Sequence, residues 1–236
     1  GTGKTFLAQK LAQHLTQNKG GFWEMVQFHP AYAYEDFVQG IRPFTDDTGT
    51  LHYSLVPGRF LDFCQRASQQ TGVCVLVIDE INRANLAAVF GELMVLLEYR
   101  DATIPLASGG SFQIPANGRL MRTMNTADRS TALGDPALCR RCAFIPLSPN
   151  YDILRQFHAR TGYDPEPLIE LLQHLNRQIA DPHYSVGITF FLEENLREQL
   201  PDIWQLEIEP YLEEFFFDQP DQIESFRWPK IASQLP

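Results

Sequence analysis

The sequence predicts an α/β fold in which a mostly parallel sheet is flanked by helices and followed by a small helical domain. Apolar, β-branched runs alternate with helical patterns in the first part of the chain, a glycine-rich turn opens it directly before a helix, and no clear strand follows Asn150. We therefore expect residues 1–150 to form an α/β domain and residues 151–236 to form a helical lid.

The composition suits a folded domain and excludes several classes of protein. The chain has 236 residues, of which 44% are hydrophobic and 20% charged, so a sizeable core can form. Its 19 basic and 29 acidic residues give a net charge of −10, which argues against a surface that is basic overall and grips nucleic acid. No apolar run approaches the ~18 residues that span a bilayer, so we expect no membrane contact and a cytoplasmic protein.

Four cysteines are too few for a disulfide scaffold in a chain of this length. Cys139 and Cys142 form a C-x-x-C pattern, but a zinc site would want a second close pair, which Cys64 and Cys74 do not supply. We therefore expect reduced, structural cysteines.

The chain begins inside a phosphate-binding motif. Its first five residues, GTGKT, match the end of the pattern G-x-x-x-x-G-K-[ST], so we expect a fragment of a longer polypeptide. The backbone of Gly1, Thr2 and Gly3 would curl around phosphate oxygens. Lys4 would reach the β- and γ-phosphates, and the Thr5 hydroxyl would bind Mg²⁺. The alternative is a glycine-rich turn before an ordinary helix.

The next elements follow from periodicity. A helix directly after the loop is predicted by apolar residues at helical spacing, which are Leu7, Ala8, Leu11, Ala12 and Leu15. Such a helix points the positive end of its dipole at the phosphates. A strand at about 23–28 and a helix come next, and then a longer loop leads to a helix at about 58–70.

An acidic pair follows the most apolar strand of the chain. Residues 73–78, VCVLVI, predict a strand buried on both faces, and Asp79 and Glu80 come directly after it. Sheets of this class place their chemistry at the carboxyl ends of their strands. Asp79 would hold Mg²⁺, directly or through water, and Glu80 would orient the attacking water. The alternative is a solvated acidic turn after a core strand.

The remaining pattern completes the two domains. A helix after Asn85 carries an apolar stripe that we interpret as core, and residues 103–114 predict a hairpin with a Gly-Gly turn. Strands are predicted at 119–124 and 143–147, with a short helix between them. In the second domain, apolar residues at helical spacing predict a helix over 168–179.

Two segments, IDEINRAN at 78–85 and MNTADRS at 124–130, stand out as motifs. They resemble the AAA+ domain of the McrB family, the nucleotide-driven motor of McrBC-type restriction systems. The resemblance continues in VQFHP, YEDF and GIRP and, near the end, in IEPYLEEF. MNTADRS is specific to this branch, whereas GTGKT and the acidic pair occur in many NTPases. The resemblance covers most of the chain and implies a P-loop NTPase fold of the AAA+ type, followed by a helical lid.

The resemblance also implies roles for polar residues within and after the MNTADRS segment. Asn125 stands where the family's polar sensor contacts the γ-phosphate or the attacking water, and Asp128 would help to hold that water. Arg140 and Arg141 match the family's arginine pair, one of which would act in trans on a neighbour's nucleotide. An arginine that acts on the nucleotide of a neighbouring copy implies a homo-oligomeric ring, usually a hexamer. The alternatives are a strand-end turn residue for Asn125 and a solvated helix end for the arginines.

The chain departs from the family pattern at several points. Arg122 lies within an expected core strand where the family has small or apolar residues, and a buried charge there would be costly unless paired. Cys139 and Cys142 also depart from the pattern, and the lid follows it only loosely at 187–190, so a second sensor is not assigned.

The family's central strand would lie upstream of Gly1. We therefore expect the strands at 119–124 and 143–147 to stand about two inter-strand spacings apart, near ~10 Å. The gap would expose apolar faces and unpaired edges, which predicts a poorly stable fragment.

The resemblance implies Mg²⁺-dependent hydrolysis of GTP or ATP that drives DNA translocation and cleavage by a McrC-like nuclease, with DNA bound through a separate domain. Two alternatives stay open. One is a MoxR-like ATPase that remodels protein complexes, against which MNTADRS counts. The other is a non-hydrolysing, nucleotide-gated scaffold, which Arg122 and the altered arginine region motivate.

Overall fold

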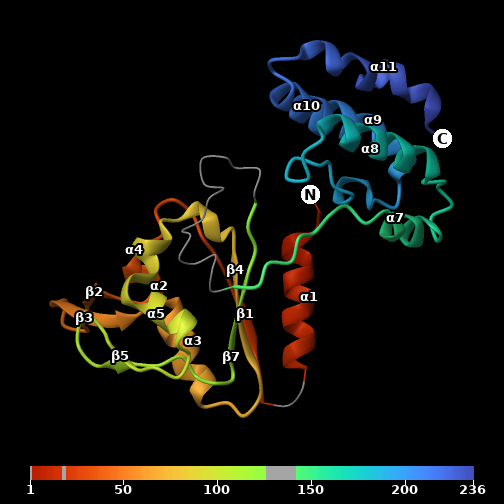
Figure 1. The fold of residues 1–236 in the computed structure, drawn as a ribbon. Helices are drawn as coiled ribbons and strands as arrows, with labels where there is room; N and C mark the ends of the chain where they lie inside the picture. Colours follow the sequence, from red (N-terminus) through yellow and green to blue (C-terminus); the bar gives the residue numbers. More distant parts are fainter. Residues whose placement is uncertain (1, 18–19, 126–141) are drawn as a thin grey trace. The chain divides into compact units, whose positions relative to one another are not determined.

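The computed structural model describes residues 2–17, 20–125 and 142–236. They divide into two compact units (Figure 1), one formed by residues 5–144 and the other by residues 145–236 together with residues 2–4. No described helix is long and apolar enough to cross a membrane.

A three-stranded parallel sheet lies at the centre of the first unit. Its strands are β1 (Trp23–Gln27), β4 (Cys74–Asp79) and β7 (Gly118–Arg122), in the order β1–β4–β7. In the register, Gln27 pairs with Asp79 and Ile78 pairs with Arg122, so the carboxyl ends of the three strands meet at one edge. The strands predicted at 23–28, 73–78 and 119–124 are confirmed, and Asp79 ends the central one.

Helices cover both faces of this sheet (Figure 1). On one face lies α1 (Lys4–Thr16), whose Ala12 packs with Val75 and Val77 of β4. On the other face lies α3 (Arg59–Ser68), whose buried phenylalanines share a core with alternate residues of β4. Because both faces are covered, all six residues of β4 are buried, as the unbroken VCVLVI run predicts.

The helix predicted after the phosphate loop forms, but much of its apolar side remains exposed. Within α1 only Ala12 is buried. Leu7, Leu11 and Leu15 are each at least 40% exposed. The leucine spacing therefore predicts the helix correctly, while the small alanine makes the close contact with the sheet.

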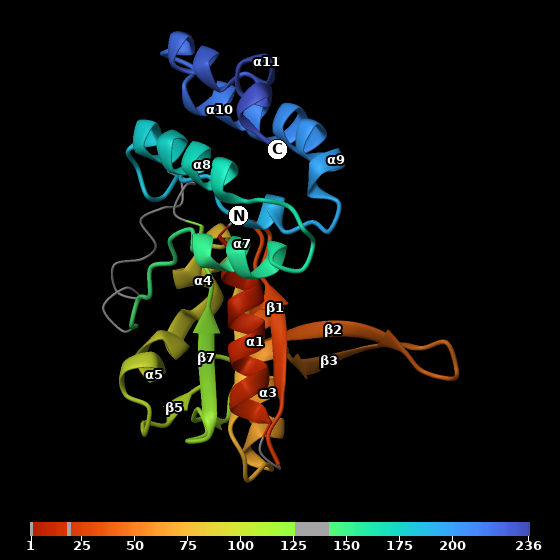
Figure 2. The same cartoon turned by 90° about the vertical axis from the view of Figure 1, so that its right-hand side faces the viewer.

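The prediction of a longer loop before α3 is wrong for most of this segment. After the short helix α2 (Tyr34–Phe37), the strands β2 (Gln39–Thr45) and β3 (Leu51–Pro57) form an antiparallel hairpin. Its turn is held by Asp46, whose Oδ1 accepts the N–H groups of Thr48 at 2.9 Å and Thr50 at 3.0 Å. Figure 2 shows the hairpin extending away from the rest of the first unit.

The helix expected after Asn85 is divided. It consists of α4 (Leu86–Phe90), a 3-10 turn (Gly91–Leu93) and α5 (Met94–Glu98), and Gly91 has a φ of +48° at the break. Its stripe is core as predicted, since Val89, Phe90 and Leu93 are fully buried. The hairpin predicted within 103–114 forms from β5 (Ile104–Pro105) and β6 (Ser111–Phe112).

The strand predicted at 143–147 does not form. These residues are irregular, and Phe144 and Ile145 are 57% and 79% exposed. A strand is stabilised by pairing with a neighbour, and within the described sheet β7 pairs only with β4. The described residues therefore contain only one of the two strands, at 119–124 and 143–147, whose spacing is predicted above.

The second unit consists of helices in its described part. Its helix α8 (Glu166–Ile179) confirms the one predicted over 168–179. The others are α7 (Tyr151–His158), α9 (Leu196–Ile203), α10 (Glu209–Phe215) and α11 (Trp228–Ile231), with a π-helical turn at Trp204–Ile208 and short 3-10 turns at Thr189–Phe191, Pro220–Gln222, Glu224–Phe226 and Ala232–Gln234. Trp204 is fully buried in this unit's own core and donates its indole N–H to the Phe226 carbonyl at 2.8 Å.

Candidate functional site

A carboxylate at the end of β4 meets a hydroxyl at the start of α1. The Thr5 hydroxyl donates a hydrogen bond to Asp79 Oδ1 at 2.8 Å, although the two residues are 74 positions apart. Asp79 is only 7% exposed, so little water screens the contact. The two residues predicted to bind Mg²⁺ are therefore brought together by the fold.

Thr123, which the sequence analysis did not single out, is bonded to both acidic residues. Its hydroxyl donates to Asp79 Oδ1 at 2.5 Å and accepts the Glu80 N–H at 3.2 Å. Its backbone continues the pairing of β7 with β4, since its N–H bonds the Ile78 carbonyl and its own carbonyl accepts the Ile81 N–H. Thr123 thus fixes both the side chain of Asp79 and the backbone of Glu80.

Glu80 adopts a backbone conformation that is uncommon for a residue with a side chain. Its φ is +52° and its ψ is +45°, in the left-handed region. Such a conformation persists only where surrounding contacts enforce it, and here the bond to Thr123 does so. The Glu80 carboxylate is 24% exposed, and its Oε2 forms an ion pair with Arg83 Nε at 3.4 Å without hydrogen-bond geometry.

The backbone at Asn125 lies next to the segment that follows Glu80. Asn82, which is buried, donates from Nδ2 to the Asn125 carbonyl at 3.0 Å. The start of the MNTADRS segment therefore lies beside the residues that follow the acidic pair, and the role of Asn125 as a sensor stays a prediction.

The phosphate-loop residues lead directly into α1. Gly3 has a φ of +81°, a conformation that favours glycine, and Lys4 is the first residue of the helix. Lys4 Nζ donates to the Thr2 hydroxyl at 3.4 Å. Thr5 follows in the same first turn, so the helix start carries the hydroxyl that contacts Asp79.

Other predicted site residues lie outside the described residues. They are Gly1, Asp128, Arg140 and Arg141, and their roles remain predictions. Arg122 belongs to the predicted strand, as the last residue of β7, and is only partly buried, so its charge is not fully withdrawn from water.

The described cysteines are free, namely Cys64, Cys74 and Cys142, and Cys139 lies outside the described residues. Cys64 and Cys74 are buried in the core. Burial raises the pKa of Cys64 to about 12, which keeps it as an unreactive thiol.

The donor set fits a small, hard cation. A hydroxyl and a carboxylate oxygen are ligands that Mg²⁺ prefers, and Mg²⁺ is usually held by one or two carboxylates together with substrate phosphates. Thr5 and Asp79 provide such oxygens beside the start of a 13-residue helix, whose dipole favours phosphate. The arrangement can therefore bind a phosphate–magnesium group with Glu80 next to it.

Comparisons with known proteins point in the same direction. Residues 1–142 match the family model for the AAA domain of the dynein-related subfamily, and residues 167–224 match that for the McrB α-helical lid domain. The chain is 38% identical to the Type IV methyl-directed restriction enzyme EcoKMcrB subunit of Escherichia coli K12, over 93% of this chain and 53% of the relative.

A second relative is the Type II restriction enzyme BsuMI component YdiS of Bacillus subtilis 168. It is 26% identical over 61% of this chain and 53% of that protein. The chain thus spans about half the length of the curated relatives it matches.

Proposed function

The chain belongs to the McrB family of AAA+ domains, and from this premise we propose that it hydrolyses a nucleoside triphosphate as the motor part of a restriction system. The predicted P-loop AAA+ fold with its helical lid is confirmed by the same matches and by the parallel sheet. The observation that carries the proposal is the contact of the Thr5 hydroxyl with the Asp79 carboxylate.

The proposed mechanism assigns each residue a separate task. Lys4 and the loop backbone bind the phosphates, and Thr5 and Asp79 hold Mg²⁺, which supplies charge neutralisation on the phosphate oxygens when bound. Glu80 accepts a hydrogen bond from the attacking water and orients it. Thr123 keeps the two carboxylates in fixed positions, so that catalysis depends on positioning and electrostatics.

The remaining parts of the proposal concern Asn125, residues outside the described structure and other chains. Asn125 and Asp128 would contact the γ-phosphate or the water, and Arg140 or Arg141 would reach the nucleotide of a neighbouring copy. We propose a homo-oligomeric ring, a hexamer, that works with a McrC-like nuclease. DNA would be bound through a separate domain, which the negative charge of this chain supports.

The direct test is phosphate release by the full-length protein with GTP and with ATP, with and without Mg²⁺. We expect Mg²⁺-dependent turnover that Glu80→Gln reduces by at least ~100-fold, because an oriented general base contributes on that scale. Nucleotide binding should remain, since Glu80 is not assigned to the phosphates. Turnover that Glu80→Gln leaves unchanged would remove Glu80 from this role, and absence of turnover with either nucleotide would contradict the proposal.

A further inference from the structure

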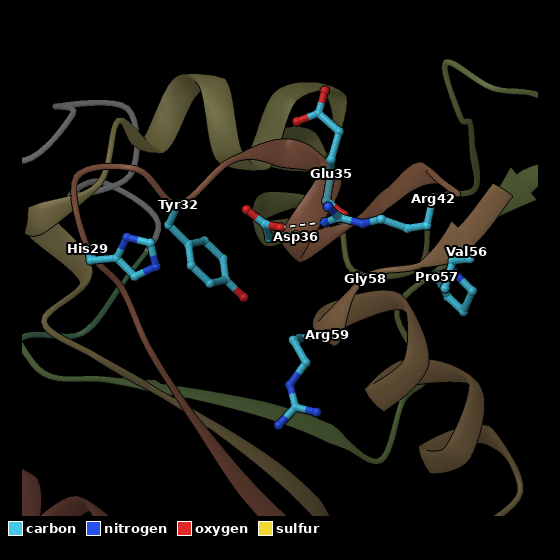
Figure 3. A pocket seen from close by; sticks show the side chains of 9 residues that line it. All are labelled: His29, Tyr32, Glu35, Asp36, Arg42, Val56, Pro57, Gly58 and Arg59. Atoms are coloured by element: carbon cyan, nitrogen blue, oxygen red, sulfur yellow. Dashed lines mark hydrogen bonds and ion pairs between the residues drawn. The ribbon is translucent and has the colours of Figure 1, made fainter. Parts of the chain in front are cut away.

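A cavity of about 440 Å³ lies in the first unit, beside the carboxyl end of β1 (Figure 3). Its walls come from the segment after β1, from α2, from the base of the β2–β3 hairpin and from the start of α3. Its volume falls in the range typical of small-ligand sites. None of the residues assigned to nucleotide hydrolysis lines it.

The Tyr32 hydroxyl is a buried donor in this cavity that has no hydrogen-bond partner among the described residues. Its ring is fixed by stacking on Phe28, with centroids 4.6 Å apart, and by an edge contact with His29. In Figure 3 the hydroxyl points toward the region between Asp36 and Arg59. A buried polar group without a partner is costly, so this donor favours a ligand that accepts a hydrogen bond.

Burial raises the pKa of Tyr32 to about 12, and the nearby Asp36 carboxylate adds to the effect. The hydroxyl is therefore protonated at neutral pH and can donate. Arg59 lines the same cavity as Tyr32, so its guanidinium is available to the same ligand.

The Arg59 side chain forms no hydrogen bond or ion pair within the described part of the protein, so its charge is available to a ligand. Arg42, which lines the same cavity, differs because it is paired with Asp36 at 2.5 Å. The cavity thus offers one neutralised cation and one available cation. His29 adds an exposed imidazole on the same side.

The start of α3 adds a further positive contribution. Arg59 is the first residue of this ten-residue helix, and the cap residue Gly58 has no side chain that could accept its free N–H groups. The positive end of the helix dipole therefore lies at the cavity wall. A buried donor, an available guanidinium and an uncapped helix start converge on one space.

These features together specify a singly charged oxyanion with a modest apolar body. Glu35 and Asp36 also line the cavity and would repel a doubly charged phosphate more strongly than a carboxylate. Val56 and Pro57 provide apolar walls. We propose that this cavity binds a carboxylate group, held by the Tyr32 hydroxyl and the Arg59 guanidinium at the amino end of α3.

The carboxylate can come from a small molecule or from an acidic side chain of a second copy of this chain, which carries 29 such residues. The first source is tested by titrating the full-length protein with sodium butyrate, a singly charged carboxylate with a short apolar chain, in a calorimeter at constant ionic strength, with inorganic phosphate as the comparison anion. We expect saturable butyrate binding that Tyr32→Phe and Arg59→Gln each weaken by about fivefold or more.

The matched control is Tyr53→Phe, which removes the same hydroxyl from an exposed hairpin tyrosine and should leave binding unchanged. Tyr32→Phe should also leave the thermal midpoint of the ligand-free protein unchanged or higher, because it removes a buried donor without a partner. Nucleotide turnover should persist in both cavity variants, so this test is independent of the proposed function.

The second source is tested by sedimentation velocity of the same variants. If butyrate does not bind but Tyr32→Phe and Arg59→Gln both weaken self-association, a second copy supplies the carboxylate and the proposal stands. The proposal is overturned if phosphate binds more tightly than butyrate, or if both variants match the unaltered protein in butyrate binding and in self-association.

Discussion

The end of β4 and the β2–β3 hairpin belong to the same unit but are stabilised in opposite ways. All six residues of β4 are buried, and the polar groups that follow it are bonded to Thr5, Thr123 and Arg83. In the hairpin, by contrast, Ile41, Tyr53 and most neighbouring apolar side chains are exposed. The first region is held by its surroundings, whereas the second is held by its own turn and ladder.

The pairing register shows how the exposed side chains of the hairpin are distributed. Directly paired residues of an antiparallel ladder share a face. The pairs Ile41–Leu55 and Pro43–Tyr53 therefore place apolar groups on one face, and Phe44 stacks on His52 on the other, with centroids 5.3 Å apart. Hydrophobicity alone thus does not locate the core of this protein, because the hairpin is apolar and exposed.

The largest expected effect comes from the core beneath the sheet. Phe60→Ala should lower the free energy of unfolding by ~3–5 kcal/mol, because Phe60 is fully buried and stacks on Phe37. Tyr53→Ala on the hairpin is the matched control and should change it by less than ~0.5 kcal/mol. Urea denaturation of both variants measures the difference, and equal losses would show that the hairpin face is buried in solution.

A smaller loss is expected at Thr123. Thr123→Val keeps the shape but leaves the Glu80 N–H without its acceptor, which should cost ~1–3 kcal/mol in unfolding free energy. Thr123→Ser keeps the hydroxyl and should recover most of it. Hydrogen exchange of the peptide containing Glu80 should also become faster in the valine variant only. Similar exchange in both variants would contradict the positioning role of the hydroxyl.

The turn of the hairpin gives a still smaller effect. Gly49 has a φ of +82° and open space around it, so Gly49→Ala meets backbone strain but no clash. The strain should destabilise the hairpin by ~1–2 kcal/mol, the cost of the left-handed region for a residue with a Cβ. Gly49→Asn, which tolerates that region better, should cost less. Amide exchange across β2 and β3 measures both variants, and identical exchange in the two would contradict this explanation.

The smallest effect is local and depends on pH. Hydrogen bonds from Thr48 first, and then from His52 and Thr50, lower the pKa of Asp46 to about 2. Because the pKa is lower in the folded state, this contribution to stability is present above about pH 4 and is lost as the pH falls towards 2. The carboxyl carbon of Asp46 should titrate near 2 in an NMR experiment. A midpoint near the ordinary value of ~3.9 would show that these bonds are not kept in solution.

The sequence predicts the buried parts of the first unit well and the exposed parts poorly. The strand at 73–78 is confirmed because burial on both faces leaves a continuous apolar signal, and the helix at 58–70 is confirmed by α3, whose buried residues lie on one face. The hairpin was missed because Pro43 interrupts β2, and a proline within a run normally argues against a strand. The strand expected at 143–147 has apolar residues but no described neighbour to pair with.

The candidate site shows the same division. The residues that we propose to bind phosphate or metal occur in short motifs with fixed spacing, so this proposal could be made from the sequence alone. The role of Thr123 could not, because it arises from the register of β7 against β4, which brings its hydroxyl to two residues more than 40 positions away. The Tyr32 cavity likewise depends on elements that meet only in the fold.

Pro43 and Pro57 protect the exposed β2–β3 hairpin against aggregation. The outer edges of a two-stranded hairpin carry unpaired N–H and C=O groups. With apolar side chains beside them, such an edge is a template on which another chain can add a strand. Proline has no amide hydrogen, and one interrupts the donors of β2 while the other closes β3. Replacing Pro43 by valine would restore a continuous row of donors along an apolar surface, and we expect the soluble yield of the protein to fall.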